Sequence, residues 1–281
     1  MELLDGKLVS KSIKNDLKKK IEEITSTGKR KPHLSIVMVG NNEASQIYVR
    51  NKIKACDYIG MDASLKLFDD SITTKELKEE VNKLNNDESI DGIIVQLPLP
   101  KHIDEHLIID TIKAEKDVDG FGVLNKGLLF CGMEGFKPAT PYGIIKLLEY
   151  YNIELEGLNA VVIGRSNIVG KPMSILLLNK NCTVTVCHSR TKNIGEITAK
   201  ADLIVVAIGK AKFLKEDMVK PGAIIVDVGM NRLESGLCGD VDFETVSQKA
   251  SYITPVPGGV GPLTIAMLLS NTFDAYCNKI K

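Results

Sequence analysis

The sequence has no tryptophan, and aromatic residues make up only 5% of its 281 positions. A surface that stacks nucleic-acid bases is therefore not expected. Its 36 basic residues are balanced by 36 acidic ones, so the basic excess typical of nucleic-acid binders is also missing. No uncharged apolar run approaches the ~18 residues of a membrane span, and residues 1–20 lack the apolar core of a signal peptide. We therefore expect a cytoplasmic protein with neither nucleic-acid nor membrane partners.

Metal ligands are scarce and scattered along the chain. The six cysteines form no CxxC motif, and no combination of them with the four histidines has zinc-site spacing. Asp117 and Asp119 lie close together, but a hard cation would need more oxygen ligands than this segment offers, and aspartates also favour turns. We predict no metal site, and we expect reduced, mostly buried thiols.

Strand-like and helix-like segments alternate throughout the sequence. Short apolar runs typical of buried strands occur at 34–40, 90–97, 159–164, 203–208 and 223–227. Amphipathic segments between them favour helices, so the chain is predicted to have an α/β fold with parallel sheets. Residues 116–140 contain five glycines and no sustained periodicity, and we predict a loop-rich crossing between two domains there.

A glycine turn between a predicted strand and a predicted helix indicates a nucleotide site. The segment AVVIGRSNIVGKP places Gly164, Ser166 and Gly170 where a backbone must approach a pyrophosphate at the positive end of a helix. An ordinary tight turn is the alternative, because the motif is not a strict GxGxxG. The next strand ends in CHSRTK, which lacks the acidic residue of NAD sites and offers a hydroxyl and positive charges instead. This end favours the 2′-phosphate of NADP over NAD.

Two polar residues stand out in the first half of the chain. Tyr48 and Lys52 are four positions apart in a predicted helix and therefore share one face. A lysine held beside a ring and a buried strand end would be desolvated, which lowers its pKa, but a solvated charged face is the alternative. Gln96 ends a predicted strand, where parallel sheets bind ligands, although it could simply cap the strand.

Near the C-terminus, residues 253–264 read ITPVPGGVGPLT and hold three glycines and three prolines. Such a segment predicts a rigid loop that permits close approach to a flat ligand. A proline-rich linker is the alternative.

These motifs occur together in one known family. The sequence resembles the bifunctional methylenetetrahydrofolate dehydrogenase/methenyltetrahydrofolate cyclohydrolases over nearly its whole length. The motifs that carry the resemblance are SQIYVRNKIKAC, DGIIVQLPLP, KDVDGF, ATPYGI, VVIGRSNIVGKP, VTVCHSRT, KPGAIIVDVGMN, GDVDF and TPVPGGVGPLT.

The resemblance implies two α/β domains with an active-site cleft between them. Residues 1–138, completed by a C-terminal helix at 263–281, would bind folate, and residues 139–262 would form a doubly wound Rossmann-type domain that binds NADP. The implied activity is oxidation of 5,10-methylenetetrahydrofolate with NADP, followed by hydrolysis to 10-formyltetrahydrofolate. The resemblance also implies a homodimer.

Site residues follow from the same resemblance. Lys52 matches the essential lysine and Gln96 the glutamine that holds it, while Tyr48 would pack on the folate ring and Asp119 would bond the pterin. Further substrate contacts are expected at Val95, Leu97, Pro255, Pro257, Gly258, Gly259, Val260, Gly261, Pro262 and Leu263. Coenzyme contacts are expected at Gly164, Arg165, Ser166, Ser189, Arg190 and Met230.

The chain departs from the family pattern at two positions. Gly122 stands where many members have the histidine of GFHxxN, and Ala139 stands where many have the cysteine of PCTP. We expect activity to survive, with altered folate affinity or altered balance of the two activities. A dehydrogenase-only member remains an alternative. A nucleotide-sensing module would have little need for the set Tyr48, Lys52, Gln96 and Asp119, and a shikimate-type dehydrogenase would not explain the Lys52–Gln96 pairing.

Overall fold

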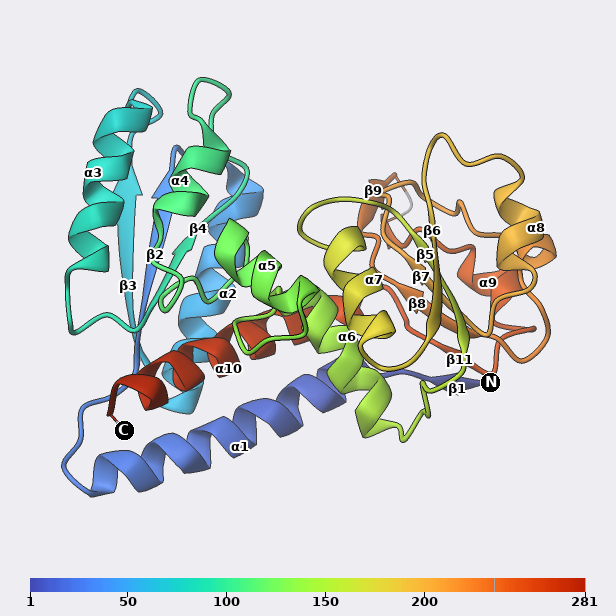
Figure 1. Cartoon of the computed structure of the whole chain (residues 1–281), viewed down its shortest axis with the longest axis horizontal. Helices are drawn as coiled ribbons and strands as arrows, with labels where there is room; N and C mark the ends of the chain where they lie inside the picture. Colours follow the sequence, from blue (N-terminus) through green and yellow to red (C-terminus); the bar gives the residue numbers. More distant parts are fainter. Residues whose placement is uncertain (235, 281) are drawn as a thin grey trace. The chain divides into compact units, whose positions relative to one another are not determined.

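The structure is a computed structural model that describes residues 1–234 and 236–280. The described residues divide into two compact units (Figure 1). The first unit combines Met1–Ser10 with Thr140–Thr264, and the second combines Lys11–Ala139 with the described residues from Ile265 onward.

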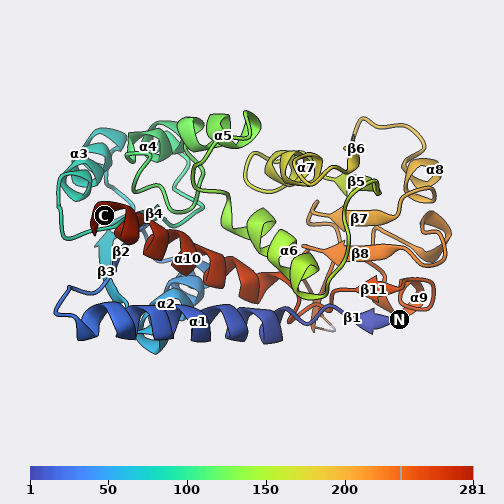
Figure 2. The same ribbon diagram turned by 60° about the horizontal axis from the view of Figure 1, so that its bottom comes forward.

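The first unit is built on a parallel sheet with the strand order β1-β11-β8-β7-β5-β6. Its strands are β1 (Glu2–Leu3), β5 (Asn159–Ile163), β6 (Thr183–Cys187), β7 (Leu203–Val206), β8 (Ile224–Asp227) and β11 (Tyr252–Ile253). Its helical segments are α6 (Ala139–Tyr150), α7 (Gly170–Leu178), α8 (Ile194–Thr198), η1 (Glu216–Met218) and α9 (Phe243–Val246). Figure 2 shows α6 and α7 on one face of the sheet and α8 and α9 on the other. An antiparallel hairpin, β9 (Asn231–Leu233) and β10 (Gly236–Cys238), follows β8.

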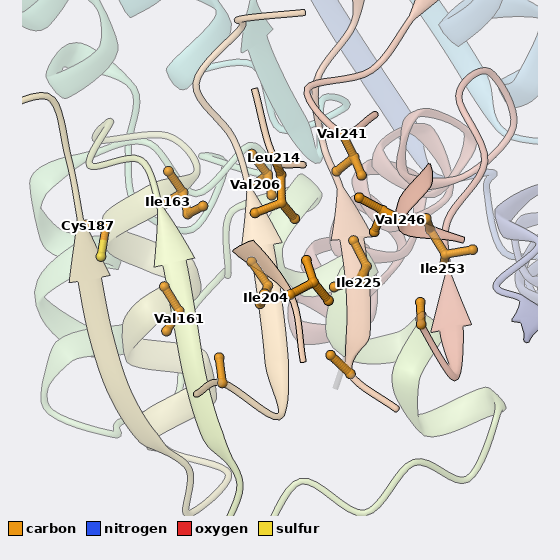
Figure 3. Packing of buried hydrophobic residues seen from close by; sticks show 14 residues of the cluster. Val161, Ile163, Cys187, Ile204, Val206, Leu214, Ile225, Val241, Val246 and Ile253 are labelled. Atoms are coloured by element: carbon orange, nitrogen blue, oxygen red, sulfur yellow. The ribbon is translucent and has the colours of Figure 1, made fainter. Parts of the chain in front are cut away.

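The core of this unit explains why its strands read as continuous apolar runs. Every residue of β7 is buried, as expected for a parallel strand covered on both faces. Val161 and Ile163 of β5 pack with Ile204 and Val206 of β7 in one apolar cluster (Figure 3). Alternate residues of a strand point to the same face, so these two pairs cover one side of the sheet together.

The second unit holds a smaller parallel sheet with the order β3-β2-β4. Its strands are β2 (His33–Val39), β3 (Asp62–Phe68) and β4 (Gly92–Val95), and its helices are α2 (Glu43–Ile59), α3 (Thr74–Asn85), α4 (Glu105–Thr111) and α5 (Val123–Phe130). Two long helices, α1 (Gly6–Ser26) and α10 (Val260–Ile280), contribute most of their residues to this unit. Val37 and Ile93 of the sheet pack in one cluster with Leu77, Val81 and Ile108 from α3 and α4.

Local signals place the ends of α2, the helix that carries the predicted lysine. The Asn42 side chain accepts a hydrogen bond from the Ser45 amide at 3.0 Å, which caps the first turn. Gly60 ends the helix in the left-handed conformation, with φ at 79°. The helix therefore spans Glu43–Ile59 and contains both Tyr48 and Lys52, as predicted.

The structure confirms the predicted α/β class with parallel sheets and corrects three details. The predicted loop at 116–140 contains α5, an apolar helix in which Asn125 and Leu129 are buried. Residues Met1–Ser10 belong to the first unit, whereas the predicted boundary placed them with the second, because β1 pairs with β11. The last helix begins at Val260, so the end of the predicted glycine- and proline-rich loop is helical.

Two absences in the described residues concern membranes and metals. None of the helices within 1–234 and 236–280 combines the length and apolar character needed to cross a membrane. No cluster of three or more histidine, cysteine or acidic side chains suited to a metal ion occurs in the same ranges.

Candidate functional site

In the second unit, α2 and the end of β4 bring Lys52 and Gln96 into contact. The Lys52 ammonium nitrogen lies 3.1 Å from Gln96 Oε1, and the lysine side chain is buried, with 8% of the residue exposed. Gln96 Nε2 donates to the Leu97 carbonyl at 2.8 Å. Because this second bond fixes the amide orientation, the Gln96 oxygen faces the lysine. Val95, the last residue of β4, directly precedes Gln96 and is buried.

Burial controls the charge state of Lys52. Removal from water lowers the pKa of Lys52 from its ordinary value, while the nearby Asp119 and Cys56 act in the opposite direction. Desolvation likewise raises the pKa of Asp119, and Lys52 opposes that shift. The two side chains are therefore electrostatically coupled, and burial favours the neutral form of each. The predicted set of Lys52, Gln96 and Asp119 is brought together within this unit.

Tyr48 lies one helical turn before Lys52 on α2. Its side chain is exposed, with 41% of the residue accessible. Cys56 lies one turn after Lys52 and is fully buried, which raises the pKa of its thiol to about 12. The three residues thus form a row from an exposed ring, through a buried amine, to an unreactive buried thiol.

A buried carboxylate shapes the turn that presents Asp119. Asp117 accepts hydrogen bonds from the Phe121 amide at 3.1 Å, the Gly122 amide at 2.9 Å and Asn125 Nδ2 at 2.8 Å. Burial raises the pKa of Asp117 to about 6, although these donors oppose the shift. Asp117 therefore stabilises a turn, which is one of the two roles that its position before Gly120 suggested. A side chain at Gly122, one of the two departures from the family pattern, would approach Asp117 Oδ2 to 3.0 Å.

In the first unit, the glycine turn lies between β5 and α7. Gly164 has φ at 131°, and a Cβ atom there would lie 2.4 Å from the Ala207 carbonyl oxygen. A Cβ atom at Gly170 would lie 2.3 Å from the Gly164 carbonyl oxygen. The Ser166 hydroxyl accepts from the amides of Val169 and Gly170 at 3.2 and 3.3 Å. The turn therefore requires glycine at both ends and leads directly to the start of a helix, where anions bind.

Basic side chains surround the neighbouring strand end. Arg165, in the glycine turn, is exposed, and so are Ser189 and Arg190, which follow β6. The backbone there is held by a short turn, in which the His188 amide donates to the Thr191 hydroxyl at 2.9 Å. The hydroxyl and the two guanidinium groups are free to meet an anionic group such as a 2′-phosphate.

Two buried aspartates, Asp227 at the end of β8 and Asp240 after β10, form a pair that the sequence does not predict. Asp227 ends β8 and accepts the amides of Gly229, Asp240 and Val241, each at 2.9 Å. Burial, together with Asp240, raises the pKa of Asp227 to about 6. Both aspartates lie in motifs that the sequence displays, but nothing in the spacing of those motifs indicates that they meet.

The segment after β11 is fixed by the N-terminal residues. The Gly258 carbonyl accepts from the Lys7 amide at 3.1 Å, and the Pro262 carbonyl accepts from the Ser10 hydroxyl at 2.9 Å. A Cβ atom at Gly6 would lie 1.7 Å from the Gly259 carbonyl oxygen. Within the predicted set, Gly259, Val260 and Leu263 are buried, whereas Pro257 and Gly261 are exposed and Pro255 is partly exposed. Met230 is 52% exposed, and its methyl group is 3.8 Å from the Cβ position of Gly261.

Known proteins match both units of the chain. The family model described as tetrahydrofolate dehydrogenase/cyclohydrolase, catalytic domain, matches residues 4–119, and that of the NAD(P)-binding domain matches residues 138–280. The chain is 56% identical over 281 residues to the bifunctional protein FolD of Campylobacter concisus, covering 100% of this chain and 99% of that protein.

Solved structures agree with these matches. The bifunctional enzyme FolD from Campylobacter jejuni is 54% identical, with a TM-score of 0.98 and 99% of each chain covered. The FolD enzyme of Trypanosoma brucei, solved with NADP cofactor and inhibitor, is 36% identical with a TM-score of 0.94, covering 99% of this chain and 97% of that one. The resemblance predicted from the motifs is thereby confirmed, and the chain belongs to the tetrahydrofolate dehydrogenase/cyclohydrolase family.

Proposed function

We propose that this protein oxidises 5,10-methylenetetrahydrofolate to 5,10-methenyltetrahydrofolate with NADP and then hydrolyses the product to 10-formyltetrahydrofolate. The observation that carries the proposal is the buried Lys52 amine held by Gln96 and coupled to Asp119. Relatives that are more than half identical over the full length bear the name of the bifunctional enzyme, which supports both activities. The intact Lys52–Gln96 pair disfavours the alternative of a dehydrogenase that lacks the hydrolytic step.

The coenzyme fits the first unit on two grounds. Gly164 and Gly170 leave a turn in which added side chains would collide with backbone, so the backbone itself can approach a pyrophosphate. Arg165 and Arg190 supply the positive charge that a 2′-phosphate requires. NADP held there would supply the acceptor for the hydride that leaves the methylene carbon of the folate. The chain contributes Met230 and the 255–263 segment as contacts on the nicotinamide side.

For the hydrolytic step, Lys52 is the group that moves a proton. Water adds to the cationic methenyl carbon, and the neutral Lys52 amine accepts the proton that the water loses. The carbon–N5 bond then breaks as the former water oxygen becomes the formyl carbonyl, and the N5 nitrogen takes up a proton. Burial supports this role because a permanently charged lysine would repel the cationic methenyl group. Gln96 keeps the amine in place by accepting a hydrogen bond from it.

Substrate orientation is assigned to two further residues. The Asp119 carboxylate would accept hydrogen bonds from the pterin amino group and ring nitrogen, which form a donor pair suited to two carboxylate oxygens. The exposed Tyr48 ring offers a flat apolar surface for the aromatic part of folate. Asp117 supports Asp119 indirectly, because its hydrogen bond from the Gly122 amide closes the turn that contains Asp119.

The test compares two identical substitutions on one helix. Lys52→Met removes the buried amine, and Lys54→Met removes an exposed one two residues away. Hydrolysis of methenyltetrahydrofolate is followed by its absorbance, and we expect at least a ~10²-fold loss for Lys52→Met, the size of a missing general base. Lys54→Met should behave like the wild type. A Lys52→Met enzyme with the wild-type hydrolytic rate would overturn the assignment.

We also propose that the protein works as a homodimer in the cytoplasm. The edge strand β6 supports self-association, because Thr183, Thr185 and Val186 are exposed along it. The six cysteines, all within the part of the chain that the structure describes, form no disulfide, which suits a reducing compartment. Sedimentation equilibrium tests the first statement, and a monomeric mass at micromolar concentration would contradict it.

A further inference from the structure

Asp240 is fully buried, and its carboxylate accepts hydrogen bonds from two segments of the first unit, one after β7 and one after β8. Its Oδ2 atom accepts from the backbone amides of Ile208 and Gly209 at 2.8 and 2.9 Å. Its Oδ1 atom accepts from Asn231 Nδ2 at 2.9 Å. The first two donors follow β7, and the third is the first residue of β9, so one side chain connects the turn after β7 to the turn between β8 and β9.

The turns that Asp240 joins carry exposed apolar side chains. Ile208 is 36% exposed and Met230 is 52% exposed, and each lies on or next to a residue that donates to the carboxylate. Apolar side chains at the carboxyl edge of a parallel sheet face the region where this fold binds dinucleotides. Their placement therefore depends on a group that need not touch the ligand.

The carboxylate has almost no freedom to move. A Cβ atom at Gly229 would lie 2.2 Å from Asp240 Oδ1, so glycine is required beside it. The Asp240 amide is itself held by Asp227 Oδ1 at 2.9 Å, and the Asp227 amide donates to the Thr254 hydroxyl at 2.7 Å. The backbone of Asp240 is thus anchored to Asp227 at the end of β8, and Asp227 is held in turn by Thr254, which precedes the 255–263 segment.

We infer that Asp240 is a positioning residue for hydride transfer, which holds Ile208 and Met230 as an apolar platform for the nicotinamide ring of the coenzyme. This inference rests on the proposed function. It assigns no role to Asp240 in hydrolysis, because Lys52, Gln96 and Asp119 all lie in the second unit. Loss of the hydrogen bonds to the Asp240 carboxylate should therefore affect coenzyme binding and oxidation much more than hydrolysis measured without coenzyme.

The experiment exchanges the donor and the acceptor of the Asp240–Asn231 pair. Asn231→Asp sets two carboxylates against each other, whereas the double variant Asp240→Asn/Asn231→Asp restores one amide facing one carboxylate with unchanged net charge. In the double variant, the amide oxygen of residue 240 still accepts from Ile208 and Gly209 while its NH₂ group donates to residue 231. Asp242→Asn serves as a control that removes a nearby carboxylate whose partners are Lys212 and Thr245 rather than Ile208, Gly209 or Asn231.

Three quantities are measured at about pH 8: the NADPH dissociation constant, the KM for NADP in the oxidation, and the hydrolysis of methenyltetrahydrofolate without coenzyme. For Asn231→Asp we expect coenzyme binding to weaken about tenfold to hundredfold, as for a lost hydrogen bond to a charged group, with hydrolysis changed less than about twofold. The double variant should recover to within about threefold of the wild type, and Asp242→Asn should match the wild type throughout.

Each result decides the matter. Unchanged coenzyme binding in Asn231→Asp would overturn the inference, and so would a double variant no better than Asn231→Asp. A parallel loss of hydrolysis and oxidation would also overturn it, because that pattern indicates general damage to the fold and not a role confined to the coenzyme site. A lowered thermal unfolding midpoint that the double variant does not restore identifies such damage. A wild-type protein that neither oxidises nor hydrolyses folates would instead refute the proposed function.

Discussion

Replacing Gln96 by glutamate changes one atom type beside the Lys52 amine and tests how that amine works. In the wild type, Gln96 Oε1 lies 3.1 Å from Lys52 Nζ. Two unit charges at this separation attract by about 5 kcal/mol at an effective dielectric constant of about 20, before any desolvation cost. A close opposite charge typically shifts a pKa by about 1–3 units, so we expect the Lys52 pKa to rise by about 2 units, equivalent to ~2.7 kcal/mol.

The sign of this shift determines the assay. A raised lysine pKa keeps the amine protonated to higher pH, so the neutral fraction at a fixed pH on the acidic limb falls about hundredfold. The hydrolytic rate should fall by the same factor and should recover as the pH rises, because the neutral amine is the proton acceptor. The measurement is the enzymatic hydrolysis of methenyltetrahydrofolate from about pH 6 to about pH 9, after subtraction of the uncatalysed rate.

Gln96→Met is the matched control. It also loses the bond to the Leu97 carbonyl and leaves Lys52 without its acceptor, but it adds no charge. Its loss of rate should therefore show no upward displacement of the pH profile. A Gln96→Glu enzyme whose profile rises at the same pH as that of Gln96→Met would refute the idea that Lys52 works in its neutral form.

Three further predictions concern charge and burial elsewhere. The folded-state pKa of about 6 for Asp117 and Asp227 exceeds the ordinary 3.8, so these groups favour folding at low pH and lose that contribution as the pH rises from about 4 to about 6, by up to ~3 kcal/mol each. Asp117→Asn should flatten this part of a plot of unfolding free energy against pH, and an unchanged slope would contradict the assignment. Ser35 has a buried hydroxyl oxygen with no hydrogen-bond partner among residues 1–234 and 236–280, so Ser35→Ala should stabilise the protein by about 1 kcal/mol in denaturant unfolding, whereas destabilisation would show that the hydroxyl is satisfied. Arg190→Ala should lower the preference for NADP over NAD about tenfold in KM, and equal losses for both coenzymes would exclude contact with the 2′-phosphate.

Elements with local signals could be predicted from the sequence, and those that depend on distant partners could not. The ends of α2 follow from the Asn42 cap and Gly60, which act within a few residues. By contrast, β1 is only two residues long and exists because β11, some 250 positions later, offers an edge for pairing. Helix α5 escaped prediction because its exposed positions include Val123 and Leu124, which leaves no polar face to give a helical period.

The same distinction applies to the site. The spacing of Tyr48 and Lys52 fits a solvated helix face as well as a catalytic one, and only the burial of Lys52 against Gln96, 44 residues away, separates the two interpretations. The family resemblance predicts the pairing of Lys52 with Gln96, because both side chains belong to motifs that can be read in the sequence. Asp240 stands in the GDVDF motif, but the motif does not show what its carboxylate holds, since most of its side-chain partners are backbone amides that any residue type could provide. Motifs therefore contain carboxylates that organise turns through backbone N–H groups without showing their role, which becomes visible only in the folded chain.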